Sequence, residues 1–165
     1  VLFTVDNLQT FASLLKLTGW DKKLNKCKDE VWEEKYDNIR GTEYTHKGTD
    51  WRGKYPEHRY IKYTIFAETD SVFKANGIEG NDNEIIASLK SWLRENAFYG
   101  EETHWGDDYE NDSNAINQFV SYHLLPEDLK WNTMWTDANE YGRSAAMMKE
   151  QGDKLSEKFY VKVWD

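Results

Sequence analysis

Residues 60–77 read Y-I-K-Y-T-I-F-A-E-T-D-S-V-F-K-A-N-G, and this stretch decides the fold because its pattern changes from strand to helix within a few residues. In its first half, Ile61, Tyr63 and Ile65 alternate with the side chains of the opposite face. Such an alternation, rich in β-branched and aromatic residues, is typical of a half-buried strand. We therefore expect a strand over residues 60–66.

The second half of the stretch has the signals of a short helix. Thr69 or Asp70 can accept a backbone N–H at the start of that helix. Val72 and Phe73 begin its apolar side, and Gly77 is placed to end it, because glycine readily adopts the left-handed conformation common after helix C-termini. A strand that continues directly into a helix is thus the predicted nucleus of the fold.

Length and composition predict one globular domain. The chain has 165 residues and a net charge of −9, and aromatic residues make up 15% of it. This length suffices to bury a core without disulfides, and the aromatic content argues against disorder. The negative charge disfavours nucleic acid and anionic membranes as partners. Cys27 is the single cysteine, so we expect no intrachain disulfide and no cysteine-based metal site.

Three amphipathic helices are predicted outside this stretch from apolar residues spaced three and four apart. The first covers residues 6–17 and has Asp6 or Asn7 as its cap. The second follows Asn81 and Glu84, which have the spacing of a capping box, and extends to about residue 96.

The third of these helices is predicted to begin after Ser113 and to end before Pro126. Its apolar side includes His123, which follows Tyr122. A buried, hydrogen-bonded structural histidine is the favoured interpretation, because burial penalises the charged imidazolium that a catalytic base would form.

Residues 25–59 have a different composition, rich in Lys, Glu, Asp, Tyr and Trp and without sustained periodicity. We expect a long loop or insertion with at most short strands, one of them over residues 42–46. Its rings either stack on sugars or fill a partner's pocket, or they form a satellite core beneath the loop. The rings assigned to possible ligand binding are Trp32, Tyr44, Trp51 and Tyr55.

Local signals for catalysis or metal binding are weak in this sequence. A nucleophile elbow, an H-E-x-x-H motif, a phosphate-binding loop and a dinucleotide fingerprint are all missing. Asp108, Glu110 and Asp112 alternate like the ligands of a calcium loop. Ser113 stands where such a loop needs glycine, so a solvated acidic loop is the competing interpretation. We expect no cofactor and assign no catalytic residue.

Two stretches resemble the signatures of the fasciclin-type domain, an adhesion module of surface proteins. Y-T-I-F-A-E-T-D-S-V-F at residues 63–73 is similar to an apolar strand followed by Thr-Asp-x-x-Phe. I-N-Q-F-V-S-Y-H-L-L-P at residues 116–126 is similar to a helix that ends in Tyr-His with a nearby Pro. Residues 11–24, with L-x-x-T-G-W at residues 15–20 and a following Leu, also resemble the family's opening helix and turn. The acidic, aromatic style and the F-A-E-T-D variant resemble the fasciclin-like surface lipoproteins of Bacteroides-type bacteria.

This resemblance covers residues 8–129 apart from the insertion at residues 25–59 and the acidic loop at residues 100–112. It implies an α+β fold, a fasciclin-like β wedge with packed helices, as a single domain over residues 1–165. The family's closing N-G-x-x-H-x-I-D strand has no counterpart, so either the C-terminal half has diverged beyond recognition or the domain lacks its closing C-terminal strands. A second chain segment or a swapped neighbour would then complete the fold. In the remaining sequence, residues 137–155 are expected to be mobile or weakly helical and residues 159–164 to form a strand.

The resemblance also implies structural roles for the motif residues. Thr69 and Asp70 would cap a helix, and Phe73 would lie in the core. Tyr122 and His123 would end the second motif, with the histidine hydrogen-bonded inside the fold.

The implied function is a non-catalytic cell-surface adhesion or binding module that recognises protein or glycan. The protein would be exported to the cell surface or periplasm and held at the outer membrane by a lipid anchor outside this chain. The alternative is a carbohydrate-capturing surface lipoprotein that uses an exposed, nearly coplanar ring pair of the insertion. A hydrolase ranks third, and would need two of Glu33, Glu34 and Asp37 to face each other across a cleft.

Overall fold

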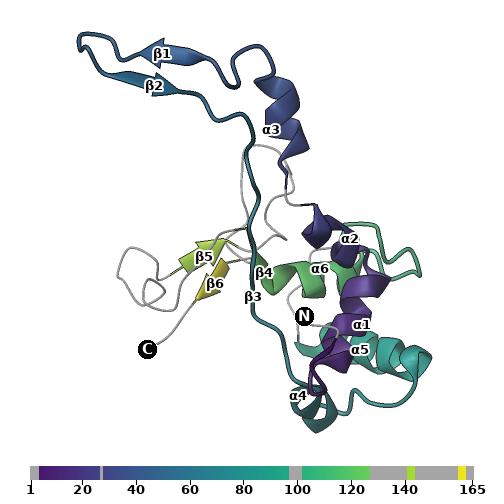
Figure 1. Ribbon diagram of the computed structural model, residues 1–165. Helices are drawn as coiled ribbons and strands as arrows, with labels where there is room; N and C mark the ends of the chain where they lie inside the picture. The colour runs from purple at the N-terminus through teal and green to yellow at the C-terminus, as the bar shows by residue number, and fades with distance from the viewer. Residues whose placement is uncertain (1–3, 27, 97–101, 127–140, 144–159, 163–165) are drawn as a thin grey trace. The chain divides into compact units, whose positions relative to one another are not determined.

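The computed structural model describes residues 4–26, 28–96, 102–126, 141–143 and 160–162 (Figure 1). Helices and short antiparallel strands occur together in these residues, which confirms the α+β class. The chain divides into two compact units, one formed by Val1–Leu24 with Tyr63–Asp165 and the other by Asn25–Lys62. Among the described residues, no helix is long and apolar enough to cross a membrane.

The first unit is built mainly from four helices, α1 (Gln9–Leu17), α4 (Asp70–Ala75), α5 (Asp82–Asn96) and α6 (Ala115–Tyr122). Helix α1 contacts α4 and α6, and α5 contacts α6 (Figure 1). Their apolar sides meet in one core, in which each fully buried aliphatic or aromatic side chain contributes about 1.5–3 kcal/mol. The larger core side chains are Phe11, Leu14, Leu15, Trp20, Phe73, Ile78, Leu89, Leu93, Ile116, Val120 and Leu124.

Helix α4 ends as its sequence predicts. Gly77 has a φ of +72°, and its N–H donates to the carbonyl of Lys74 at 3.0 Å. The N–H of Ile78 reaches back to the carbonyl of Phe73 at 2.9 Å. These two bonds form a Schellman motif, whose apolar contact is supplied by Ile78 and Phe73 in the core.

The predicted capping box at the start of α5 is confirmed. The Asn81 N–H donates to the Glu84 carboxylate at 2.8 Å, and the Glu84 N–H donates to the Asn81 side chain at 3.2 Å. Each side chain thereby satisfies a backbone donor that the helix itself leaves free.

Helix α6 differs from its prediction at both ends. Its cap is Asn114 and not Ser113, because the Asn114 side chain accepts the Ile116 N–H at 2.9 Å. The helix stops at Tyr122, and the chain then forms the strand β4 (Leu124–Leu125). Both leucines are buried, so the apolar run that suggested a longer helix belongs to a strand in the core.

The predicted strand over residues 60–66 is much shorter in the structure. Only β3 (Thr64–Ile65) finds a partner strand, the antiparallel β4, and the Phe66 N–H extends this pairing to the His123 carbonyl at 3.0 Å. Tyr60 instead forms an isolated bridge with Lys28 of the second unit. Alternation alone therefore overestimated the strand, because pairing decides its length.

The second unit contains a helix that the sequence analysis missed, α3 (Glu30–Lys35). Asp29 caps this helix by accepting the Trp32 N–H at 3.0 Å. The predicted strand at residues 42–46 is confirmed as β1 (Glu43–Thr45), which pairs with β2 (Arg52–Lys54) in an antiparallel hairpin.

A third antiparallel pair joins β5 (Tyr141–Arg143) to β6 (Tyr160–Lys162). The strand predicted at residues 159–164 is thus confirmed where it is described. The prediction of a mobile or weakly helical segment over residues 137–155 is wrong at β5, and otherwise falls outside the described residues.

Candidate functional site

The hairpin of the second unit places three of the candidate rings together. Tyr44 on β1 stands opposite Gly53 on β2, and its ring lies across that glycine. A Cβ atom at Gly53 would lie 2.6 Å from the ring carbon Cζ of Tyr44, so only glycine leaves room for the ring. Tyr55 then packs on Tyr44 with ring centroids 4.6 Å apart. The hairpin is therefore ordered by ring contacts.

Trp51 is the exposed member of this group. It contacts the edge of Tyr44 at a centroid distance of 6.1 Å and His46 at 5.5 Å, while 58% of its surface stays exposed. The Trp51 carbonyl accepts the His46 N–H at 2.9 Å, and the Trp51 N–H donates to the Thr49 hydroxyl at 3.3 Å. The connecting loop thus fixes the backbone that carries the indole.

The ring geometry contradicts part of the carbohydrate hypothesis. That hypothesis required a nearly coplanar exposed pair, but Tyr44 and Tyr55 are inclined by 40° and Tyr44 and Trp51 by 75°. Trp32 packs on Tyr36 of the same unit at 38°. These rings are inclined to one another because each packs on a neighbouring ring, as aromatic pairs prefer, and not on a buried core.

The alternative hypothesis, that these rings form a satellite core, is also only partly met. None of the described residues between 28 and 62 is buried, although Trp32, Tyr36, Tyr44 and Tyr55 are half-buried. A unit of this size has too little interior to enclose large rings. The unit therefore exposes part of its aromatic surface to solvent, most of all at Trp51.

Two of the three carboxylates considered for hydrolysis are held by basic side chains. Glu33 contacts His58 Nδ1 at 2.9 Å and Arg40 at 3.2 Å, and Asp37 contacts Arg40 at 2.6 Å. Glu34 is exposed. These three groups form ion pairs or face solvent, which differs from the opposed pair that the hydrolase hypothesis requires.

The calcium candidates do not converge. Glu110 pairs with Lys22 and Asp112 with Lys23, each at 3.1 Å, so both carboxylates point toward α2 (Trp20–Asn25). Within the described ranges, no group of three or more His, Cys, Asp or Glu side chains could hold a metal ion. Glu110 and Asp112 of this alternating stretch thus tie a loop to a helix by salt bridges.

Lys90 of α5 holds the other side of the acidic loop. Its ammonium group contacts the Asp107 carboxylate at 2.9 Å, the Gly106 carbonyl at 3.0 Å and the Tyr109 hydroxyl at 3.3 Å. Burial alone would lower the pKa of Lys90, but the hydrogen bonds to Asp107 and Tyr109 raise it above 10.5. The ammonium group is therefore a permanent structural charge.

Phe73 of the first motif lies in the core as expected, but Thr69 and Asp70 have other roles than the sequence suggested. Thr69 occupies the N-cap of α4 without a side-chain capping bond, and its hydroxyl pairs with that of Ser71 at 2.8 Å. Asp70 caps α1 instead, because its carboxylate accepts the N–H groups of Thr10 at 2.8 Å and Gln9 at 3.1 Å. The cap expected at Asp6 or Asn7 is wrong, since α1 begins after Leu8, which has no side-chain acceptor.

His123 of the second motif lies inside the first unit. Its Nδ1–H donates to the Phe119 carbonyl at 2.8 Å, because a carbonyl oxygen can only accept. The ring packs on Phe11 and Phe119, and Tyr122 contacts it edge-on at 5.8 Å. Burial lowers the pKa of His123 below 6.5, although the Phe119 bond and the Glu68 carboxylate 3.6 Å from Nε2 act in the opposite direction.

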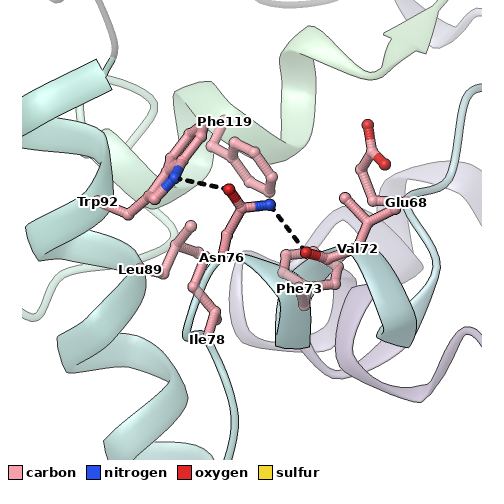
Figure 2. Close-up of a pocket in the computed structure, with 8 residues that line it drawn as sticks. All are labelled: Glu68, Val72, Phe73, Asn76, Ile78, Leu89, Trp92 and Phe119. Atoms are coloured by element: carbon pink, nitrogen blue, oxygen red, sulfur yellow. Dashed lines mark hydrogen bonds between the residues drawn. The ribbon is translucent and has the colours of Figure 1, made fainter.

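A pocket that the sequence analysis did not anticipate lies between α4, α5 and α6 (Figure 2). Its volume is about 90 Å³. Asn76 crosses the pocket wall, donating to the Val72 carbonyl at 2.8 Å and accepting the Trp92 indole N–H at 3.2 Å. The sequence signal for this pocket was Val72, which was predicted on the apolar side of α4. In the structure, 43% of the surface of Val72 is exposed. The lining residues are Glu68, Val72, Phe73, Asn76, Ile78, Leu89, Trp92 and Phe119.

Comparison with known proteins adds no relative: no family model matches the chain, and no curated protein or solved structure matches it significantly. The likeness to fasciclin-type domains therefore rests on the motifs at residues 63–73 and 116–126, and it stays a prediction.

Proposed function

We propose that this chain is a non-catalytic binding module of the cell surface, and that Trp51 contacts its protein or glycan ligand. The observation that carries this proposal is the geometry of Trp51, an indole that is 58% exposed yet held by Tyr44 and His46. The cell-surface location and the adhesive role come from the resemblance to fasciclin-type domains and are part of the proposal.

An exposed and oriented indole is well suited to binding. Covering the remaining surface of Trp51 would release about 25 cal/mol for each Å² of apolar area removed from water. Because ring contacts and the loop hydrogen bonds already restrict this residue, little side-chain entropy is lost when a ligand covers it. Tryptophan is also among the residues that most often dominate binding energy at interfaces.

The surroundings of Trp51 supply the polar rim that such a contact needs. His46, Thr49 and Arg52 are all exposed next to it in sequence or in ring contact. A sugar would place its C–H face on the indole and its hydroxyls on this rim, whereas a protein would insert an apolar side chain. The absence of a coplanar partner ring limits a sugar contact to the one indole.

The test compares two variants that remove equally exposed rings. Tyr60 is 56% exposed and belongs to the same unit, but it lies outside the hairpin, so Tyr60→Ala is the matched control for Trp51→Ala. Labelled protein is applied to a glycan array and to intact cells of the source organism. We expect one of the two surfaces to bind the wild type, and Trp51→Ala to weaken that binding about 30-fold, equivalent to a hot spot of about 2 kcal/mol.

Binding to the array identifies a glycan ligand, and cell binding that survives removal of surface glycans identifies a protein. Equal binding by the wild type and Trp51→Ala would overturn the assignment of Trp51. Failure to bind either surface would overturn the binding-module proposal as a whole.

A further inference from the structure

We propose that the pocket between α4, α5 and α6 binds the side chain of a lysine from a protein partner. The aliphatic stem of the lysine would occupy the apolar lining, and its ammonium group would pair with Glu68. This site belongs to the first unit and does not depend on the hairpin or on Trp51.

The size of the pocket selects a short aliphatic chain. Its volume of about 90 Å³ is smaller than the cavity of about 150 Å³ that holds benzene in an engineered protein core. A lysine stem has four carbons, which matches a space of this order. A long acyl chain would be too large.

The chemistry of the lining also favours an aliphatic stem. Phe73, Ile78 and Leu89 are buried beneath the pocket, and Trp92 and Phe119 form its sides (Figure 2). Asn76 introduces a polar group, but its amide already bonds to the Val72 carbonyl and the Trp92 indole. A polar ligand group would therefore lose its hydrogen bonds to water and gain none from the lining. A methylene chain makes no such hydrogen bonds and has none to lose.

Glu68 gives the pocket its charge preference. This residue lies beside Val72, at the end of the pocket away from Trp92 (Figure 2). Its side chain is 41% exposed, so it keeps contact with solvent at the pocket edge. The chain carries a net charge of −9, and residues 25–62 contribute little to it because acidic and basic side chains nearly balance there. The net charge of the chain thus favours the approach of cations over that of carboxylates and phosphates.

The geometry at Glu68 favours an ammonium group over a guanidinium group. One carboxylate oxygen, Oε1, faces His123 Nε2 at 3.6 Å. Arginine recognition uses both oxygens of a carboxylate, whereas the lysine ammonium acts as a point charge and needs one. Because the pocket holds only a stem, the rest of the ligand must lie on the surface, where Val72 offers exposed apolar area to a polypeptide.

The experiment follows the Trp92 indole N–H resonance in an NMR titration of the full chain. The probes are n-butylammonium and n-butanol, which share the stem and differ in charge, and two blocked peptides, Gly-Gly-Lys-Gly-Gly and its Gln counterpart. We expect millimolar binding of butylammonium and of the Lys peptide. Butanol and the Gln peptide should bind at least about five-fold more weakly. In the wild type, 0.5 M salt should weaken butylammonium binding and leave butanol binding unchanged.

Two variants separate Glu68 from the general charge of the protein. Glu68→Gln should reduce butylammonium binding to the level of butanol. Glu95→Gln, an equal change of charge at an exposed α5 position outside the lining, should leave it unchanged. The wild-type salt series decides the charge preference independently if Glu68→Gln does not fold.

Three results would overturn the proposal. The first is equal binding of butanol and butylammonium by the wild type. The second is that neither compound shifts the Trp92 resonance. Binding of butylammonium without the Lys peptide would exclude a polypeptide lysine as the occupant.

Discussion

The Asp70 carboxylate accepts the backbone N–H of Thr10 at 2.8 Å, so a side chain at the start of α4 caps a helix 60 residues earlier in the chain. The N–H of Asp70 in turn donates to the Asn7 carbonyl at 2.9 Å. A motif that looks like a local helix start is therefore a tertiary link between α1 and α4.

Asp70→Ala should destabilise the first unit by about 1 kcal/mol, because the first turn of α1 loses its only side-chain acceptor among the described contacts. Chemical denaturation measures this difference. The control is Asp6→Ala, which removes an exposed carboxylate from the position where the sequence predicted the cap. A larger loss from the control than from Asp70→Ala would refute this assignment.

Acid should weaken the same link. Burial tends to raise the pKa of Asp70, but the hydrogen bonds from Thr10 and Gln9 outweigh it and lower the pKa below 3.8. As the pH falls, the carboxylate of Asp70 therefore binds a proton in the unfolded state before it does so in the folded state. The stability that ionised Asp70 contributes is complete above about pH 4, and it is lost as the pH falls through the lowered pKa of the folded state. The stability difference between the wild type and Asp70→Asn should shrink over that range, and a constant difference from pH 7 to pH 2 would contradict it.

His123 should produce a separate stability loss at mildly acidic pH. Its folded pKa is lowered below 6.5 by burial, so the unfolded state binds the proton more readily than the folded state. The stability that depends on neutral His123 is thus complete above about pH 6.5 and falls as the pH drops through the folded pKa. Melting temperatures of the wild type and His123→Asn from pH 8 to pH 5 measure this loss. An identical pH dependence in both proteins would show that His123 does not cause it.

Gly53→Ala should disturb the rings of the hairpin while leaving the first unit folded. The new Cβ would lie 2.6 Å from Tyr44 Cζ and 2.7 Å from its hydroxyl oxygen, so the Tyr44 ring must move away from Tyr55. Near-ultraviolet circular dichroism should therefore change for Gly53→Ala. Thr45→Ala, which alters an exposed neighbour on β1, should leave the spectrum unchanged. Equal spectra for the two variants would mean that Tyr44 does not pack on Gly53.

The sequence predicts those elements whose signals are local. Helix α5 has its capping box within four residues and a long apolar stripe, and Gly77 ends α4 through bonds to the preceding turn. Helix α3 also has a local signal in its Asp29 cap, but it lacks an apolar stripe, and its Val31 is 76% exposed. Periodicity could therefore not detect it.

The rest depends on contacts between distant segments. Two residues, Leu124 and Leu125, are too few for their pattern to distinguish a strand from the end of a helix. They form a strand because they pair with β3, which is distant in the sequence. Asp70 could not be assigned to α1 without knowing that the two helices meet. In the same way, the pocket exists only where three helices converge, and the exposure of Trp51 depends on how Tyr44 and His46 pack around it.

The central claim is that Trp51 contacts the ligand, and the most direct test records the indole N–H resonances of the wild type while the ligand found on the array or on cells is added. The Trp51 resonance, assigned by its absence in Trp51→Ala, should shift in a saturable way, while that of the buried Trp20 should stay in place. A saturable shift of other indoles with an unchanged Trp51 resonance would contradict the claim.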